Sequence, residues 1–324
     1  MNSEKCMSLA AAISRFVTPG AHLSLGGFTL NRNPMAAVYE IIRQRIGNLH
    51  VYAHSNGQGV DELIGAGCVK AVEIAYGGTG RFAPTCIRFR KAIEEGRILF
   101  EDYSNYQMTL RFMAGAMGVP FLPTTSSLGT DIIYKWGLSP EVRQQDSRLP
   151  LDKLVVLDNP FKRQPEEPEK VVLVPAINPD VTIIHVQQAS PRGTVRMAGL
   201  TFADVEQAKA ARHLIVTCEE LVEEDELRRQ PGQNQIPFFY ADAVVAQPFG
   251  AYPTACYGYY DYDPEYLQQY GQDARDDGRY AAYLEKNIYA VRDHQQFCEL
   301  IGSERFARIK AASPQGYAVG LERG

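Results

Sequence analysis

The sequence lacks several patterns that would assign a protein to a class at first sight. Its six cysteines lie far apart and include no Cys-x-x-Cys pair, which argues against a zinc site and against a disulfide framework. We therefore expect free thiols, mostly buried, in a reducing cytoplasm. No stretch approaches the roughly 18 consecutive apolar residues of a membrane span, and no basic segment precedes an apolar block near the N-terminus. Neither a membrane segment nor a signal peptide is expected.

The patterns of common nucleotide-binding and nucleic-acid-binding proteins are missing as well. No basic stretch alternates with aromatic residues, and the net charge is −5, so we expect no nucleic-acid partner. The P-loop pattern Gly-x-x-x-x-Gly-Lys does not occur. The run HLSLGGFTLNRNP at residues 22–34 has a glycine pair after a short apolar strand, but it lacks the third glycine of Gly-x-Gly-x-x-Gly. The sequence therefore disfavours a dinucleotide fingerprint.

What the sequence does contain is a regular alternation of strand-like and helix-like segments. Between the first two apolar runs, for example, Met35, Val38, Ile42 and Ile46 form a helical stripe. Such alternation predicts an α/β fold with an open, mostly parallel sheet that helices cover on both faces. We expect strands at residues 22–27, 49–54, 69–80, 97–103, 119–124, 171–176, 181–189, 213–218 and 241–248.

The chain is long enough for one large domain with a sizeable core, because 45% of its 324 residues are hydrophobic. We expect residues 1–324 to form a single domain. The stretch at about 137–170 is rich in proline and charge, which indicates a surface excursion between two halves. From about residue 264 the sequence predicts a mostly helical C-terminal part.

Three predicted strands end in glycine or small polar residues, at Gly26-Gly27, Ser55-Asn56 and Gly77-Gly78. In open α/β sheets the ligand crevice lies outside the carboxyl ends of the strands, so these loops are the expected site. A glycine pair followed by a helix N-terminus can hold a pyrophosphate or a carboxylate. A tight strand-to-helix turn explains this first stretch equally well.

The run HLSLGGFTLNRNP resembles the glycine-rich signature of the α subunits of family I CoA-transferases. Later segments resemble that family in the same order, namely EDYSNYQMTLRFMAGAMGVPFLP, SSLGTD, DVTIIHVQQASPRGTVR and DAVVAQPFGAYPTACYGYYDYD. The resemblance extends over nearly the whole chain. It is closest to the glutaconate-type α subunits, including Arg32, where many relatives carry glycine.

The resemblance implies a covalent mechanism. The nucleophile is a glutamate of the β subunit, which attacks the acyl-CoA thioester, and the released CoA thiolate converts the resulting anhydride into a glutamyl-CoA thioester. The family's Glu-Asn-Gly motif is absent here, and the Glu-x-Gly runs at 94–96 and 322–324 are better interpreted as a helix end and a chain terminus. We therefore expect no catalytic nucleophile in this chain, and we expect its partner to be a β subunit, in an α2β2 assembly by resemblance.

The resemblance also implies that CoA enters as the substrate thioester, with no tightly bound cofactor. A metal is not expected either, because no two of the six histidines show convincing metal-ligand spacing. Two alternative functions remain: an acyl-CoA hydrolase of the steroid-ring-opening type, and a non-enzymatic metabolite-binding protein of the same fold.

Asn105 is the most informative candidate for a supporting role. It falls where many relatives carry a glutamine near the reacting carboxylate, and where the related ring-opening hydrolases carry a glutamate. An amide can donate a hydrogen bond but cannot act as base or nucleophile, so Asn105 favours the transferase. A shift of two residues would place Gln107 there instead, and Ser104 is a further candidate. The same segment can also be a polar cap of the next helix.

The remaining candidates would line the cleft for the thioester and the acids, with backbone N–H groups of the glycine loop as oxyanion donors. They are Gly26, Gly27, Phe28, Thr29, Asn31, Arg32, Ser55, Asn56, Gly77, Gly78 and Thr79. A dicarboxylic acid needs a second anion holder, for which Arg32, Arg81 and Arg88 are candidates.

Two other polar features are interpreted as structural rather than catalytic. We interpret Glu101-Asp102 as a solvated strand end rather than a general acid, and His185, inside an apolar run, as a core histidine.

Five tyrosines suit a contact between subunits, since tyrosine is large and rigid with a polar tip. They are Tyr252, Tyr257, Tyr259, Tyr260 and Tyr262.

Overall fold

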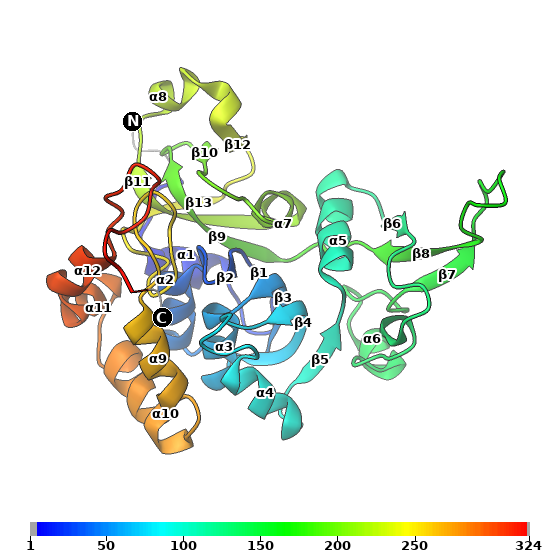
Figure 1. The fold of residues 1–324 in the computed structure, drawn as a ribbon, viewed down its shortest axis with the longest axis horizontal. Helices are drawn as coiled ribbons and strands as arrows, with labels where there is room; N and C mark the ends of the chain where they lie inside the picture. Colours follow the sequence, from blue (N-terminus) through cyan, green and yellow to red (C-terminus); the bar gives the residue numbers. More distant parts are fainter. Residues whose placement is uncertain (1–4, 323–324) are drawn as a thin grey trace.

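A parallel β-sheet forms the centre of the computed structural model, which describes residues 5–322. Within that range the strands run parallel in the order β13-β11-β9-β1-β3-β4-β5. The α/β class with a mostly parallel sheet, predicted from the sequence, is thus confirmed (Figure 1). The strands are β1 (His22–Leu25), β3 (Leu49–Asn56), β4 (Val69–Gly77), β5 (Leu99–Asp102), β9 (Val181–Ala189), β11 (His213–Leu221) and β13 (Ala243–Ala246).

The sheet extends in two directions from β1, its central strand. β1 lies between β3 and β9, with Leu23 paired to Val51 on one side and to Val181 on the other. Strands β3, β4 and β5 extend one half, and β11 and β13 extend the other. The boundary between β1 and β9 is therefore the topological switch point, where open α/β sheets bind their ligands.

Three short strands extend the central sheet. β2 (Phe28–Thr29) continues beside β3 beyond the end of β1, so that Phe28 pairs with Ser55. β10 (Val195–Arg196) pairs antiparallel with the last two residues of β9, and β12 (Asn234–Ile236) pairs antiparallel with β10. These additions enlarge the edge at which β1 and β3 end.

Successive residues of the strands point to opposite faces of the sheet. Leu23 and Val51 join the larger core, which α1 (Leu9–Phe16), α2 (Met35–Arg43), α3 (Gln58–Gly65), α4 (Ile87–Glu94) and the C-terminal helices cover. Tyr52 and Ile184 belong to two smaller cores, which contain residues of α5 (Asn105–Met117) and α7 (Asp204–Ala210). Helices thus cover both faces.

The C-terminal helices lie together on the side opposite α5 (Figure 1). They are α9 (Pro264–Asp273), α10 (Asp277–Leu284), the π-helical η3 (Glu285–Tyr289), α11 (His294–Ile301) and α12 (Ser303–Ile309). The connections also contain η1 (Asp131–Ile133), α6 (Pro140–Gln145), α8 (Glu224–Arg228) and η2 (Pro231–Gln233). Among residues 5–322, no helix is long and apolar enough to cross a membrane.

A second, antiparallel sheet lies in a lobe beside α5 (Figure 1). It contains β6 (Phe121–Thr124), β8 (Lys170–Pro175) and β7 (Val155–Asp158) in that order. The predicted strands at 119–124 and 171–176 exist, but their assignment to the main sheet is wrong, because they pair with each other. The lobe therefore extends beyond the predicted excursion at about 137–170.

A buried ion pair fixes α5 to both sheets. The Arg111 guanidinium, on α5, lies 2.5 Å from a carboxylate oxygen of Glu73 on β4, and its Nε donates to the carbonyl of Pro175 at the end of β8 (3.2 Å). His50 contacts the other Glu73 oxygen at 2.8 Å. Burial by itself would raise the pKa of Glu73, but Arg111 and His50 hold it well below its usual range. The pair therefore stays charged at neutral pH.

We predict that Arg111→Met lowers the free energy of unfolding by about 3–5 kcal/mol, because it leaves the Glu73 charge buried without its main partner. Urea denaturation measures the change. Arg90→Met is the matched control, since Arg90 lies in an exposed pair with Glu94 at 3.8 Å; its effect should stay below about 1 kcal/mol. Equally small effects of the two variants would contradict the anchoring role.

Two adjacent carboxyl groups on α3 connect this helix to the C-terminal helices. Asp61 accepts from Tyr270 Oη at 2.7 Å, and Glu62 accepts from Tyr283 Oη at 3.0 Å. Both carboxyl groups are fully buried, with no cation among the partners that contact them in the described chain. Burial raises the pKa of Asp61 to about 6 and that of Glu62 to about 8.

A raised carboxyl pKa means that the folded chain binds the proton more tightly than the unfolded chain. We therefore predict that the stability contributed by Asp61 and Glu62 is fully present below their unfolded pKa values of 3.8 and 4.5, and is lost as the pH rises through 6 and toward 8. The slope is at most about 1.4 kcal/mol per pH unit for each group that titrates. Glu62→Gln should flatten this slope in urea denaturation at several pH values, and the exposed Glu94→Gln should not. A slope that Glu62→Gln leaves unchanged would refute the assignment.

Candidate functional site

The glycine loop after β1 turns sharply at Gly27, which has a φ of +84°. A Cβ there would lie 2.6 Å from the carbonyl oxygens of Asn31 and Arg32, so the turn requires glycine. The N–H of Gly26 donates to the Ile183 carbonyl (2.9 Å), that of Gly27 to Asp204 Oδ1 (2.8 Å) and that of Phe28 to the Asn31 carbonyl (2.8 Å). These three N–H groups are therefore not free to bind an oxyanion, contrary to the prediction.

Arg32 holds this loop from inside. Its guanidinium is buried, lies 2.5 Å from Asp204 Oδ2, and also donates to the Leu200 carbonyl at 2.8 Å. The prediction that Arg32 extends toward an anionic ligand is thus wrong. Arg88 is likewise buried and paired with Asp277 at 2.5 Å, whereas Arg81 is exposed. Of the three arginine candidates, only Arg81 lies at the surface.

The loops that follow β1, β3 and β4 meet around Gly57, at the carboxyl ends of these strands. A Cβ on Gly57 would lie 2.7 Å from the Gly78 carbonyl, 2.7 Å from Thr79 Cγ2 and 2.8 Å from the Thr29 carbonyl. Asn56, at the end of β3, is buried and connects to the loops after β1 and β4, since its Nδ2 donates to the Gly26 carbonyl (3.1 Å) and its backbone carbonyl accepts from the Gly78 N–H (3.1 Å). The structure thus brings these predicted residues together as a frame.

The glycine that ends β4 belongs to the same frame. A Cβ on Gly77 would lie 3.2 Å from the ring of Phe89 on α4, and Thr79 is buried. Neither residue is at the surface. Gly77 and Thr79 therefore shape the loop rather than face the crevice.

An exposed polar corner lies where β3 ends beside the first turn of α5. Ser55 Oγ donates to Asn105 Oδ1 at 2.6 Å, and His54 Nε2 donates to the Asn105 carbonyl at 3.1 Å. Asn105 is exposed, and among residues 5–322 its Nδ2 donates to no protein acceptor. The corner therefore presents an amide N–H group whose orientation Ser55 fixes.

Ser104 and Gln107, unlike Asn105, bind each other at the start of α5. The Gln107 N–H donates to Ser104 Oγ (3.1 Å), and the Ser104 N–H donates to Gln107 Oε1 (3.0 Å), which makes a capping box at the start of α5. Gln107 is fully buried. Of the three candidates in this segment, Asn105 is the exposed one.

His54 is part of this corner, although the sequence analysis did not select it. Because a carbonyl can only accept, the hydrogen bond to Asn105 places the neutral ring's proton on Nε2. Burial lowers the pKa of His54, which keeps the ring uncharged at neutral pH. The ring of Phe28 lies 5.6 Å from that of His54 and stacks on Phe202 at 4.5 Å. Adjacency to Ser55 was the only signal for His54 in the sequence.

Glu101 is buried rather than solvated, so that prediction is wrong. Its carboxylate contacts Arg143 at 2.6 Å and Lys153 at 3.0 Å, and it accepts the N–H groups of Gly137 and Leu138. These two ion pairs and two backbone bonds hold the 137–153 segment against β5. The cations lie 42 or more residues away in the chain, so no local pattern around Glu101 indicated them.

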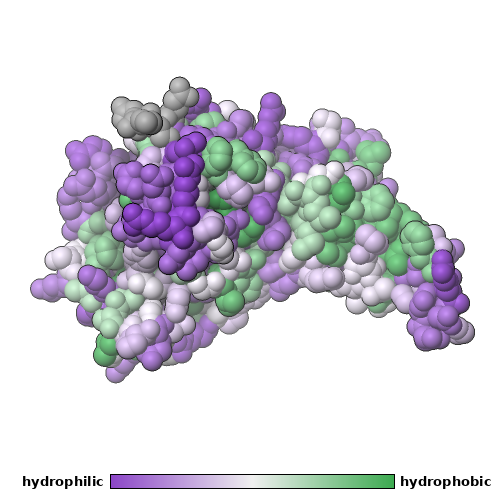
Figure 2. Space-filling view, turned by 90° about the horizontal axis from the view of Figure 1, so that it is seen from above, coloured by the Kyte–Doolittle hydropathy of each residue, from purple (hydrophilic) through white to green (hydrophobic). Residues whose placement is uncertain are grey.

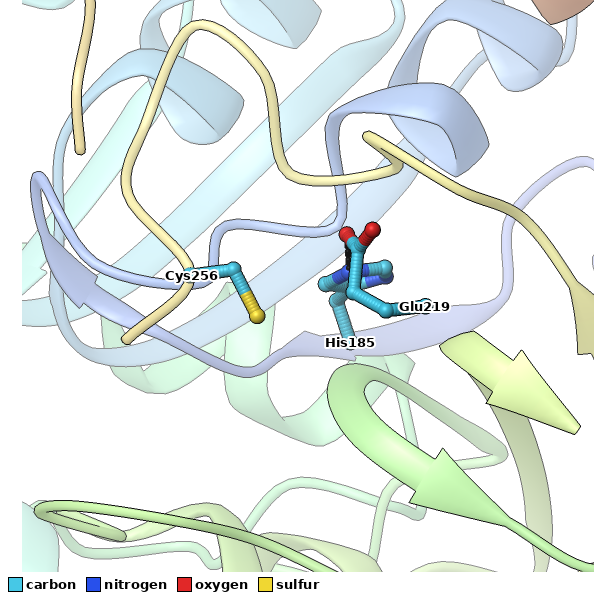
Figure 3. Close-up of side chains that lie close together, drawn as sticks. All are labelled: His185, Glu219 and Cys256. Atoms are coloured by element: carbon cyan, nitrogen blue, oxygen red, sulfur yellow. Dashed lines mark hydrogen bonds and ion pairs between the residues drawn. The ribbon is translucent and has the colours of Figure 1, made fainter. Parts of the chain in front are cut away.

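His185, Glu219 and Cys256 converge behind the glycine loop (Figure 3). His185 Nδ1 contacts Thr217 Oγ1 at 2.9 Å, and its Nε2 contacts Glu219 Oε1 at 2.6 Å. The second Glu219 oxygen accepts the Phe249 N–H at 2.8 Å. Burial raises the pKa of the Cys256 thiol, whereas a metal needs the thiolate. Because the ring nitrogens and carboxylate oxygens already have protein partners, we interpret the cluster as an internal polar network.

The tyrosine cluster divides into a buried and an exposed part. Tyr252 and Tyr260 are buried and donate to Asp263 and Glu219, so their assignment to a contact between subunits is wrong. Tyr257 is exposed at a cavity of about 490 Å³ beside the glycine loop. Phe202 lines the same cavity, so the Phe28–Phe202 stack separates it from the polar corner.

A model of the coenzyme A transferase family matches residues 6–247. The chain belongs to the coenzyme A transferase family. Within this family, the chain is 41% identical to the A subunit of glutaconate CoA-transferase from Acidaminococcus fermentans over 319 residues, which are 98% of each protein. It is 31% identical to the A subunit of 3-oxoadipate CoA-transferase from Pseudomonas knackmussii over 294 residues, 90% of this chain and 96% of that protein.

The crystal structure of glutaconate coenzyme A-transferase from Acidaminococcus fermentans has the same fold. It matches with a TM-score of 0.93 at 42% identity and covers 97% of this chain and 98% of that chain. The CoA-transferase family and fold that the sequence predicted are therefore confirmed.

We predict that Asp204→Asn loosens the glycine loop, because the Gly27 N–H and Arg32 both bind the Asp204 carboxylate. Hydrogen–deuterium exchange should become at least about tenfold faster at residues 26–33. Asp225→Asn is the matched control, since Asp225 is 90% exposed on α8; its exchange should match that of the wild type. Unchanged exchange in Asp204→Asn would contradict the role of this carboxylate.

Proposed function

We propose that this chain is the α subunit of a glutaconate-type CoA-transferase, which moves CoA between an acyl-CoA and a free, dicarboxylic acid. Similarity to the glutaconate CoA-transferase chain over nearly the full length of both proteins supports this assignment. Both curated relatives are A subunits, which implies a second kind of chain. For it we propose a β subunit in an α2β2 assembly. The six free cysteines suit a cytoplasmic location.

The β subunit supplies the nucleophile in this proposal. Its glutamate attacks the thioester carbonyl, the C–S bond breaks, and CoA leaves as the thiolate with an acyl-glutamyl anhydride behind it. The thiolate then attacks the glutamyl carbonyl, which releases the first acid and leaves a glutamyl-CoA thioester. A second carboxylate reverses these steps. Consistent with this, Glu94 and Glu95 are exposed at the end of α4, while Arg323 and Gly324 lie outside the described residues.

The observation that carries the proposal for this chain is the exposed amide of Asn105. Ser55 binds its oxygen, so its N–H group points away from Ser55 and can donate to the developing oxyanion or to the acid. His54 holds the backbone of the same residue and stays neutral. An amide at this position cannot act as the base of a hydrolase, which argues against the ring-opening alternative.

The other candidate residues keep narrower roles in the proposal. Phe28 and Thr29 are partly exposed and border the proposed crevice, Asn31 lines the neighbouring cavity, and Ser55 is buried and holds Asn105. Arg81 is exposed and is the proposed cation for a second carboxylate. CoA is the substrate thioester, and no tightly bound cofactor or metal is required. The frame that shapes the crevice consists of Gly26, Gly27, Arg32, Asn56, Gly77, Gly78 and Thr79.

We predict that Asn105→Ala, in the complex with the β subunit, lowers kcat for CoA transfer by about 100-fold, because an oxyanion donor is lost. Transfer from an acyl-CoA to a dicarboxylic acid measures kcat, and size-exclusion chromatography shows whether the two chains still associate. Gln144→Ala, which removes an exposed amide on α6, is the matched control and should keep full activity.

Three outcomes would contradict the proposal. Unchanged turnover of Asn105→Ala would remove this residue from the site. Transfer by the isolated chain would show that the nucleophile is not on a partner. Hydrolysis of acyl-CoA without an acceptor acid, at the rate of transfer, would favour the hydrolase.

A further inference from the structure

The cavity of about 490 Å³ beside the glycine loop has the size and lining of a small-molecule site. Residues from four segments form its wall, at 31–32, 198–202, 255–262 and 316–317. Most of their side chains are aromatic or aliphatic, with a few polar groups among them. The hydrophobic residues over the lobe, in contrast, lie on an open surface (Figure 2). Because a hollow can enclose a small ligand, its lining indicates what that ligand carries.

The ring of Tyr257 is a fixed part of this wall. Gly199 and Gly316 lie against it, both with a φ of +78°, and a Cβ on them would lie 3.1 Å and 3.0 Å from the ring. Gln187 Nε2 donates to the carbonyls of Tyr257 and Ala198, at 3.1 Å each, and so joins two of the four segments. The chain itself therefore sets the shape of the cavity.

The charges beside the cavity favour an anion at one place. Arg32 offers no unbalanced charge, because Asp204 neutralises it at 2.5 Å. Asp261 is buried in the wall and repels a carboxylate placed beside it. The Arg81 guanidinium is exposed and donates to the hydroxyl of Tyr262, another wall residue, at 2.8 Å. A ligand can thus place a carboxylate beside Arg81, whereas the rest of the cavity suits uncharged carbon atoms.

Two ring contacts connect the cavity to the polar corner. The Phe28 ring lies 5.6 Å from that of His54 and 4.5 Å from that of Phe202, so the His54 and Phe202 rings are at most about 10 Å apart. Phe28 and Phe202 are both partly exposed. A chain that starts at Asn105 can therefore pass over these two rings into the cavity.

A small dicarboxylic acid has the length that this path requires. With C–C bonds of about 1.5 Å, the two carboxyl carbons of a five-carbon acid are roughly 5 Å apart when the chain is extended. A hydrogen bond of about 3 Å at each end brings the span to roughly 10–12 Å. An acid whose reacting carboxylate contacts Asn105 therefore reaches the cavity with its other end.

We propose that this cavity receives the remote half of the acid, namely the end of its carbon chain and a second carboxylate held by Arg81, and that the cavity wall limits the length of the chain. The inference rests on the proposed function, because it needs the reacting carboxylate at Asn105. It adds the feature by which the protein selects its acid.

The first test removes the cation from the complex with the β subunit. Arg81→Met should lower kcat/KM for glutarate, the five-carbon dicarboxylate, at least about tenfold, because a charge-assisted hydrogen bond is lost. The loss should appear mainly in KM, since the remote carboxylate takes no part in the chemical step. Arg90→Met, which removes an exposed cation on α4, is the matched control and should change kcat/KM less than about twofold.

The second test changes the volume of the cavity in both directions. Ala198→Phe adds a ring at an exposed wall position, and Tyr257→Ala removes one. The ratio of kcat/KM for adipate, with six carbons, to that for succinate, with four, should fall at least about tenfold in the first variant and rise in the second. Ala281→Phe, at an exposed position of α10, is the matched control and should keep the wild-type ratio. A merely loosened loop would shift both variants in the same direction.

Hydrogen–deuterium exchange of the wild-type complex locates the acid independently of any variant. Glutarate should protect residues 198–202 and 257–262, and CoA alone should not. Unchanged ratios in both cavity variants, shifts in the same direction, or unchanged turnover of glutarate by Arg81→Met would overturn the proposal. Protection by CoA without an acid would assign the cavity to CoA and also overturn it. A wild-type complex that transfers CoA to none of these acids would overturn the proposed function, while protection by glutarate would still decide whether the cavity binds an acid.

Discussion

The ion pair between Arg111 and Glu73 is the contact on which the geometry of the proposed site depends. It binds α5 to the main sheet, and through the Pro175 carbonyl it binds the small sheet as well. Asn105 is the first residue of the same helix, so the position of the exposed amide relative to Ser55 follows from an anchor about one and a half turns further along α5. Without Arg111, the charge of Glu73 would be buried without its main partner, which costs free energy. The ion pair therefore holds α5 firmly in this position.

The polar corner and the glycine loop divide the work of the site. The loop's conformation depends on Gly27 and on the Arg32–Asp204 pair, and its first N–H groups are bonded within the chain. The loop therefore supplies shape, whereas Asn105 supplies a free donor. In the proposed function the nucleophile comes from another chain, and this separation suits that arrangement.

Local sequence pattern was sufficient for the strand–helix alternation and the parallel sheet, and it placed Gly26, Asn56 and Gly78 in loops that the structure brings together. It failed where residues far apart in the chain decide the outcome. The apolar run at 171–176 reads like any buried strand, and only its pairing with β6 puts it in the second sheet. Arg32 looked like a ligand-binding cation because its partner Asp204 is 172 residues away. Glu101 looked solvated for the same reason, and His54 was missed because only its contact with Asn105 gives it a role.

The Arg32–Asp204 pair also ties the first half of the chain to the second, across the switch point. The hairpin at 159–169 lies outside both sheets, so a cut there would separate two fragments with matching strand edges, β1 on one and β9 on the other. Each fragment alone would expose one charged side chain that is buried in the intact chain, Arg32 in the first fragment and Asp204 in the second. The two halves of the chain are in this sense complementary, because the burial of both charges and the pairing of β1 with β9 need both of them.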